Sequence, residues 1–191
     1  MRRACLALAA SAMLAACAQA DKAATAVASA AQAQATPTLS TSDATFLNTA
    51  AQDGIAEVTF GQLARQKGSR AAVRDYGMRM VADHTKLNQQ ITQLAQAKQL
   101  SPILRMDSAH QAEYDRLNQL SDRAFDHAYL DRAATDHAAA LTAFRSEAAS
   151  GTDPQVRALA GKSAPMIQQH LALAKHLGGK ILPAPAPAPG F

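Results

Sequence analysis

The chain has 191 residues, of which 19 are lysine or arginine, 15 are aspartate or glutamate and none is tryptophan. This length suits one domain with appended segments. The mild positive balance of +4 provides no basic stripe, which argues against nucleic acid as a partner.

Residues 1–16 predict a signal peptide for export. Arg2 and Arg3 precede an apolar run from Ala4 to Ala16, and this run is too short to cross about 30 Å of hydrocarbon as a helix. A basic start, a short apolar run and small residues are together typical of a secretory signal. The protein is therefore expected to act outside the cytoplasm.

Two cleavage sites compete at the end of this signal. Leu14-Ala15-Ala16-Cys17 resembles a bacterial lipobox, in which Cys17 would be lipidated and become the mature N-terminus. Ala18-Gln19-Ala20 would instead release a soluble periplasmic protein. We favour the lipobox because the cysteine is otherwise unexplained, and Ala18 after it resembles outer-membrane lipoproteins. The expected location is the periplasmic side of the cell envelope, with the lipid on Cys17 as the contact to the membrane.

Composition divides the rest of the chain into a tether, a domain and a tail. Residues 17–42 are mostly Ala, Gln, Thr and Ser, which cannot bury enough apolar surface to offset ordering and so predict a flexible tether. Residues 43–179 show helical periodicity throughout and no strand alternation. Residues 180–191 are rich in Pro and Ala and predict a disordered, extended tail.

Five helices are expected in the domain, from its capping residues, prolines and glycines. Ser69 can cap the second helix. Ser101-Pro102 and Asp153-Pro154 each place a capping residue before a proline, a pattern typical of a first helical turn. The expected helices span about 43–66, 69–99, 102–120, 121 or 122 to 150, and 154 to 178 or 179.

The two halves of the domain share a pattern that predicts a duplicated helical hairpin. Phe46 precedes Glu57 by 11 residues, and Phe125 precedes Asp136 by the same 11. The short helix from Pro102 would then lie in one long crossover connection between the hairpins. The predicted fold is all-α: a ferritin-like four-helix bundle with an extra short helix in the crossover.

Each of the four long helices directs one ionisable side chain toward the expected core. For any one histidine, a hydrogen bond within the core is the simpler interpretation, because a buried charge is costly and the imidazole would be neutral. A neutral imidazole is equally able to bind a metal. The four side chains together form a candidate transition-metal site, for Zn, Mn or Cu, consisting of Glu57, His84, His137 and His170.

The residues around these histidines exclude a di-iron centre. Such a centre takes a Glu from each of two helices and a Glu-x-x-His from each of the other two. Val81 and Ile167 stand three residues before His84 and His170, and neither can bind a metal. At most one further carboxylate, Asp136, could join the site.

Three methionines precede a histidine by four residues, a spacing that places two side chains on one helical face. Thioether and imidazole ligands would suit copper, Cu(I) in particular. The alternative, which we favour, is that the methionines fill gaps in the core. Met80 and Met166 are the candidate extra ligands, and the pairs are Met80 and His84, Met106 and His110, and Met166 and His170.

The sequence contains no motif of an enzyme. Nucleophile elbows, phosphate-binding glycine loops and cysteine pairs are all missing from it. We therefore predict that the protein is not an enzyme.

An ordered set of segments resembles a known bacterial family. The segments are FLNTAAQDGIAEVTFGQLARQKGSRAAVRDYGMRMVADHTKLN, FDHAYLDRAATDHAAALTAF, GTDPQVRALA and the late His170. They are similar to the family called "domain of unknown function 4142", which comprises exported proteins with a ferritin-like helical fold. The resemblance covers roughly residues 43–177. It implies the fold and export, and it implies no activity.

The resemblance also assigns individual residues. The family's Ala-Glu-Val corresponds to Ala56-Glu57-Val58, and its two Asp-His steps correspond to Asp83-His84 and Asp136-His137. Two pairs depart from it: Gly77-Met78, where an aromatic residue and Ala are usual, and Ala133-Ala134, where larger apolar residues are usual. These departures predict thinner packing near the candidate site, and hence a cavity or poorer support for its ligands.

Two functions are compatible with these observations. The first is a lipid-anchored, non-enzymatic envelope protein that acts by binding or interaction with an envelope protein partner, with stress tolerance as its role. The second is a transition-metal-binding bundle that uses the inward-facing His and Glu side chains. We favour the first from the sequence alone, because a tether of this kind lets a compact domain sample the space near a membrane.

Overall fold

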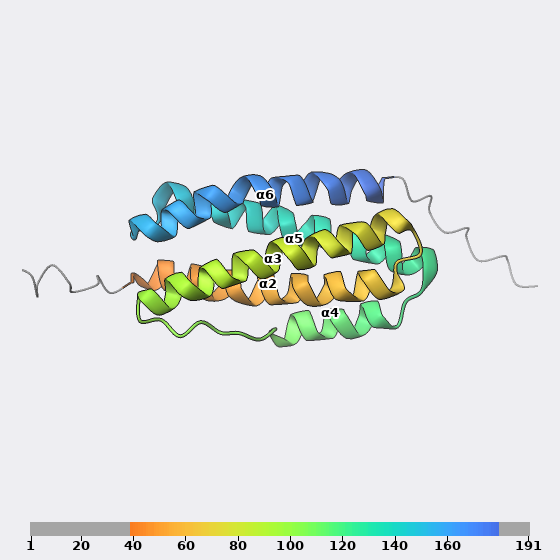
Figure 1. Ribbon diagram of the computed structural model, residues 1–191, viewed down its shortest axis with the longest axis horizontal. Coiled ribbons are helices and arrows are strands. Elements are labelled where there is room, and N and C mark those ends of the chain that lie inside the picture. Colours follow the sequence, from red (N-terminus) through yellow and green to blue (C-terminus); the bar gives the residue numbers. More distant parts are fainter. Residues whose placement is uncertain (1–38, 180–191) are drawn as a thin grey trace, which may run out of the picture. The chain divides into compact units, whose positions relative to one another are not determined.

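The computed structural model describes residues 39–179, which form five helices and no strands. Helices α2 (Thr41–Lys67) and α3 (Ala71–Ala97) pack together as one hairpin, and α5 (Asp122–Ser150) and α6 (Pro154–Gly178) form a second. Helix α4 (Ser108–Asn118) lies along α2, within the long connection that joins the two hairpins (Figure 1). The prediction of an all-α, ferritin-like bundle with a short helix in its crossover is confirmed.

Two apolar clusters fill the interior of the bundle, one toward each end. The first contains Phe60, Tyr76 and Phe125, and the second contains Ile91 and Phe144. Along each of the three helices that carry a buried histidine, residues of one cluster precede that histidine and residues of the other follow it. The histidines therefore form a polar layer between two hydrophobic cores.

Short polar side chains cap several helices, and Asp153 does so as the sequence predicts. Asp153 caps α6 by accepting hydrogen bonds from the backbone N–H groups of Gln155 and Val156, and Pro154 occupies the first turn. Ser40 caps α2 in the same way, through the N–H of Asp43 at 3.1 Å. These caps satisfy N–H groups that have no partner within the helix.

The prediction that Ser69 caps the second helix is wrong. Arg70 occupies the N-cap position of α3 and makes no side-chain cap. The carboxylate of Asp126, from the opposite hairpin, accepts hydrogen bonds from the N–H groups of Ser69 and Arg70 and from the Ser69 hydroxyl (2.9, 3.1 and 2.7 Å). A buried carboxylate from another helix thus replaces the local cap.

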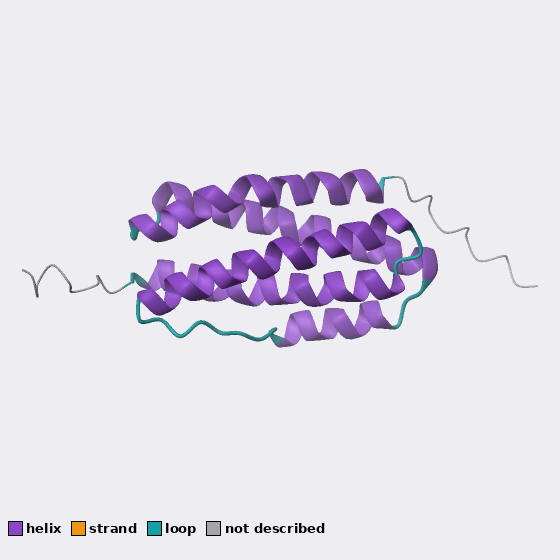
Figure 2. Cartoon of the chain, in the orientation of Figure 1, coloured by secondary structure: helices purple, strands orange, loops and turns teal. Residues whose placement is uncertain are grey.

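The prediction of a helix from Pro102 is also wrong in its start. Helix α4 begins only at Ser108, after an N-cap at Asp107 (Figure 2). The chain turns at Gln99, which has a positive φ of 60°, and the N–H of Ile103 donates to the side chain of Asn48 on α2. The segment between α3 and α4 is irregular and lies beside α2 at Ile103.

The ends of the two hairpins are built alike. Asp43 on α2 accepts hydrogen bonds from the N–H groups of Thr152 and Asp153, which connect α5 to α6. Asp126 on α5 accepts the equivalent bonds from Ser69 and Arg70, which connect α2 to α3. Arg74 donates to the carbonyl groups of residues 68 and 69, and Arg157 donates to those of residues 151 and 152. The equivalent residues are 83 apart in the sequence. The structure thus supports a duplicated hairpin.

This repeat corrects the register that the sequence suggested. Phe46 and Phe125 are 79 residues apart, four fewer than the residues that are equivalent in the structure, which is about one helical turn. In the structural register Gly54 on α2 corresponds to His137 on α5. Gly54 lies against Asn88, whose side-chain oxygen is 2.0 Å from where a Cβ would stand.

The thin packing expected at Gly77 is absent. A Cβ on Gly77 would lie 2.7 Å from the carbonyl oxygen of Gly61, and a Cβ on Gly61 would lie 2.8 Å from that of Gly77. The two glycines let the backbones of α2 and α3 approach closely, so α2 itself fills the space. Ala133 is buried within the first core cluster.

Of the five helices, none combines the length and apolar character needed to span a membrane.

The cross-hairpin carboxylate predicts a large loss of stability in an Asp126→Ala variant. Removal of Asp126 leaves the two backbone N–H groups at the start of α3 without their acceptor, at a cost of about 2–4 kcal/mol in the free energy of unfolding. Urea denaturation measures the change. The matched control is Asp131→Ala on the exposed face of α5, which should change stability by less than about 0.5 kcal/mol. Equal effects of the two substitutions would contradict the assignment.

Candidate metal centre

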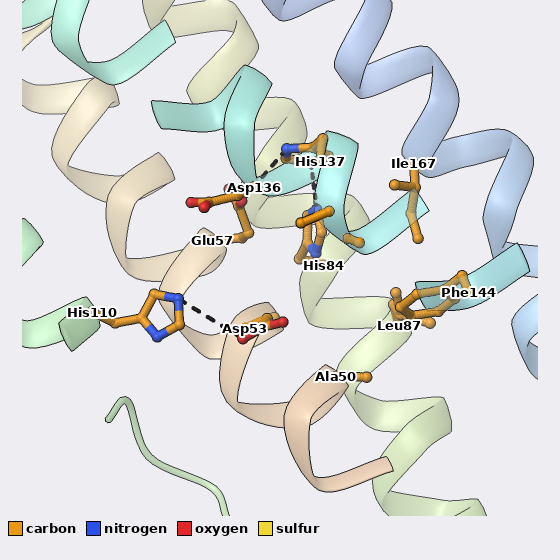
Figure 3. Close-up of a pocket in the computed structure, with 13 residues that line it drawn as sticks. Ala50, Asp53, Glu57, His84, Leu87, His110, Asp136, His137, Phe144 and Ile167 are labelled. Atoms are coloured by element: carbon orange, nitrogen blue, oxygen red, sulfur yellow. Dashed lines mark hydrogen bonds and ion pairs between the residues drawn. The ribbon is translucent and has the colours of Figure 1, made fainter. Parts of the chain in front are cut away.

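Three histidines from three helices meet in the polar layer. His84 on α3, His137 on α5 and His170 on α6 are 6%, 1% and 1% exposed. One nitrogen from each ring lies within 4.8 Å of the other two, and the Nε2 atoms of His84 and His137 are 3.2 Å apart (Figure 3). The sequence prediction that these side chains face inward holds for all three.

Outer partners fix the tautomer of two of these rings. Nδ1 of His137 lies 2.8 Å from the carbonyl oxygen of Ala133, which can only accept, so Nδ1 carries the proton. Nε2 of His170 lies 2.8 Å from a carboxylate oxygen of Asp83 and is protonated for the same reason. The other nitrogen of each ring therefore carries the lone pair: Nε2 of His137 faces Nε2 of His84 at 3.2 Å, and Nδ1 of His170 has no partner among the described residues.

His84 differs from the other two histidines because it has no such outer partner. Its Nε2 faces His137, and its Nδ1 is buried without a hydrogen-bonding partner in the part of the chain that the structure describes. Nδ1 of His170 is unpartnered in the same sense. Each buried nitrogen without a partner costs about 1–3 kcal/mol of stability. The histidine layer therefore contains polar atoms whose hydrogen-bonding capacity is not met by the described residues.

Burial keeps all three imidazoles neutral. It lowers the pKa of His84 well below its ordinary value, and the neighbouring His137 and His170 lower it further. Burial likewise lowers the pKa of His137 to about 4. For His170 burial lowers the pKa against the opposing effect of Asp83. Near neutral pH the three rings are therefore neutral, which is the state that binds a metal.

The spacing of the rings fits a single ion. All three pairs of ring centroids are 5.3 Å apart, so the rings occupy the corners of an equilateral triangle. Its centre lies about 3.1 Å from each ring, and a metal bound to an imidazole nitrogen at about 2.0–2.1 Å lies about 3.2 Å from the ring centre. Two nitrogens on a tetrahedral metal are about 3.4 Å apart, close to the 3.2 Å between His84 and His137, while the separations among all three nitrogens extend to 4.8 Å.

Glu57, the fourth predicted residue, lies beside this group and not within it. Its Oε1 is 3.5 Å from Nδ1 of His137, the side of the ring that faces Ala133. Burial raises the pKa of Glu57 well above its usual range, and the charges of Asp136 and Asp53 raise it further. Its Oε2 is buried and has no partner among the described residues.

The other predicted ligands are engaged elsewhere. Asp136 pairs with Arg132 on its own helix at 2.5 Å. Met80 is fully buried in the first core cluster, and Met166 packs against the second, as the core interpretation predicts. Met106 precedes the start of α4 at Ser108, so the argument that it shares a helical face with a histidine does not apply.

Asp83 is the residue of this site that sequence reasoning missed. Its neighbour His84 faces the core, and adjacent residues on a helix point about 100° apart. Asp83 does lie 3.5 Å from Arg79 on its own helix, but it also binds His170 on α6. A carboxylate behind a metal-binding imidazole orients the ring and raises its basicity. The adjacent Asp-His pair was the one available signal.

The fold and these side chains define a class: a ferritin-like helical bundle whose three buried histidines could bind a metal ion. The family model described as "Domain of unknown function (DUF4142)" matches residues 28–177. The chain therefore belongs to this family, which confirms the resemblance seen in the sequence. No curated protein matches the chain.

One solved structure is similar in fold, a DUF305 fragment from Deinococcus radiodurans. The two chains share 13% sequence identity with a TM-score of 0.68, and the match covers 75% of this chain and 99% of that one. At this level of identity the similarity concerns the fold alone.

The lowered pKa of His137 predicts a loss of stability in acid for the metal-free protein. The unfolded chain binds a proton below pH 6.5, whereas folded His137 binds one only below about pH 4. Stability should therefore fall as the pH decreases from 6.5 to 4, by up to about 1.4 kcal/mol per pH unit for this group. His137→Gln should reduce the slope by up to this amount.

Urea denaturation in a chelator, at several values between pH 4 and 7, measures this slope. His127→Gln is the control, because His127 is exposed on the same helix and should leave the slope unchanged. Identical slopes for the wild type and His137→Gln would refute the prediction.

Proposed function

We propose that this protein binds one transition-metal ion through His84, His137 and His170. The observation that supports the proposal most directly is the arrangement of three neutral imidazoles around one point. Two of them have their outer nitrogen bound to Ala133 or Asp83, which leaves a lone pair available on the other. Core hydrogen bonding alone does not account for the unpartnered nitrogens of His84 and His170.

The set of donor atoms favours zinc or copper over manganese. Imidazole suits zinc, copper, iron and nickel, whereas manganese prefers carboxylate and other oxygen ligands. Glu57 is the buried carboxyl group beside His137, and burial raises its pKa well above its usual range. We therefore assign Glu57 to the surroundings of the metal and the three histidines to its coordination, with Zn²⁺ as the first candidate and Cu²⁺ as the second.

Metal binding should stabilise the domain and should depend on His84. One equivalent of Zn²⁺ per chain is expected. At a hundredfold excess of free metal over Kd the gain is about 2.7 kcal/mol, or roughly 5–11 °C in Tm. His84→Ala should lose both the stoichiometric metal and the increase in Tm. The measurements are elemental analysis and thermal denaturation, after removal of metal and addition of Zn, Mn or Cu.

His127→Ala is the matched control for this experiment, since it removes an exposed histidine from α5 and should keep full binding. Circular dichroism shows whether His84→Ala retains its helices. A wild-type protein that takes up no stoichiometric metal, with an unchanged Tm for all three metals, would refute the proposal.

We further propose that the domain is held at the periplasmic side of the envelope by a lipid on Cys17. The supporting pattern, Leu14-Ala15-Ala16-Cys17, lies outside the described residues. Cys17→Ser should move the protein from the membrane fraction to the soluble periplasm and abolish palmitate labelling, whereas Cys5→Ser should keep both. Soluble wild-type protein that begins at Asp21 would favour cleavage after Ala20 instead. The envelope protein partner and the role in stress tolerance stay predictions.

A further inference from the structure

Helix α4 is attached to the bundle mainly at its C-terminal end. Of its 11 residues, Leu117 is the only one that is buried. Next to it, the side-chain ammonium group of Lys67 on α2 donates to the backbone carbonyl oxygen of Asn118. Segments with few buried contacts open locally at a low cost in free energy. The N-terminal half of α4 therefore depends on a small number of contacts to stay in place.

His110 provides the contact between this N-terminal half and α2. Its side chain is 13% exposed, and the centroid of its ring lies 6.2 Å from that of Phe60 on α2. Nδ1 is 3.0 Å from the carboxylate of Asp107, the N-cap of α4. Nε2 is 3.8 Å from the carboxylate of Asp53 on α2 (Figure 3). The imidazole thus stands between a carboxylate of its own helix and a carboxylate of the bundle.

The duplicated hairpin shows what is particular about Asp53. Asp53 and Asp136 are 83 residues apart and occupy equivalent positions in the two hairpins. Asp136 pairs with Arg132 on its own helix, but the residue equivalent to Arg132 is Thr49. Asp53 is instead paired with His110 from α4. An arginine is always charged, whereas a histidine changes its charge between about pH 5 and 8.

Loss of the proton from His110 would break the contact with α2 and keep the contact within α4. The protonated ring donates from both nitrogens, and the neutral ring from one only. The nearer carboxylate, that of Asp107, keeps the remaining proton on Nδ1. Nε2 then turns a lone pair toward the carboxylate of Asp53, and two acceptors do not bind each other. The other charged groups around this site form ion pairs of their own: Asp136 with Arg132 on α5, and Glu113 with Arg116 on α4.

We propose that α4 is a pH-responsive strap, whose N-terminal half is held on α2 while His110 is charged and loosens when His110 is neutral. The strap contributes His110 to the wall of a cavity of about 110 Å³, which His84 and His137 also line. A rise in pH therefore uncovers this cavity. The inference is independent of metal binding, because His110, Asp107 and Asp53 lie outside the histidine cluster.

Amide hydrogen exchange of the intact protein at about pH 5.5 and about pH 7.5 tests the strap, since these values lie on either side of the range in which an imidazole titrates. Protection factors, which refer each amide to its unstructured rate at the same pH, isolate the opening of the helix. Protection of residues 108–118 should fall roughly two- to fivefold at the higher pH, the effect expected for a partly exposed ion pair. Protection of α3 should stay unchanged.

Variants at both ends of the contact assign this response to its residues. His110→Gln has no charge and should show the lower protection of α4 at both pH values. His110→Lys stays charged throughout and should keep the higher protection at both. Asp53→Asn removes the partner on α2 and should abolish the response without any change to α4 itself. His127→Gln is the matched control, because His127 is exposed on α5, and it should respond to pH as the wild type does.

Three results would overturn the strap. The first is equal protection of α4 in the wild type at the two pH values. The second is a fall in His110→Gln or Asp53→Asn as large as that of the wild type. The third is a fall of the same size in α3, which would indicate a general loss of stability instead of the release of one helix.

Discussion

The burial of three imidazoles at one height of an apolar bundle is the constraint on which the rest of this structure depends. A charged imidazole in this position would be very costly, so each ring must stay neutral, and a neutral ring has one donor and one acceptor nitrogen to satisfy. Ala133 and Asp83 bind the outer nitrogens of His137 and His170. The inner nitrogen of His137 faces Nε2 of His84, and that of His170 has no partner among the described residues.

The duplicated hairpin explains how such a layer could be placed without disturbing the fold. Its equivalent elements, the capping carboxylates and the arginines that bind the hairpin loops, lie at the ends of the bundle. The centre does not follow the repeat: His137 corresponds to Gly54, where the side chain of Asn88 fills the space. The repeated geometry at the ends fixes the helices, while the middle is asymmetric and carries the histidines in one place only among the described residues.

The sequence was informative wherever a local rule decided the outcome, and uninformative wherever a distant group did. Helical periodicity predicted the bundle and the inward direction of His84, because an apolar face must be buried. The pairing of His170 with Asp83 and the position of Glu57 behind His137 depend on the rotation of one helix against another, which single-helix patterns do not contain. The prediction of the cap at the start of α3 failed for the same reason, because the carboxylate that caps it belongs to Asp126 in the other hairpin.

The same cross-hairpin contacts bear on the function, because they set the height of the histidines. A slip of one helical turn would move a ring by about 5.4 Å, which exceeds the 5.3 Å between ring centroids and would destroy the triangle. Asp126 holds the start of α3, and His84 lies 14 residues further along, roughly 21 Å of helix. A rigid helix transmits that fixed end to the centre. Caps at the ends of the bundle therefore act as positioning groups for the three histidines, which they never touch, and the histidine cluster inherits its geometry from the register of the hairpins.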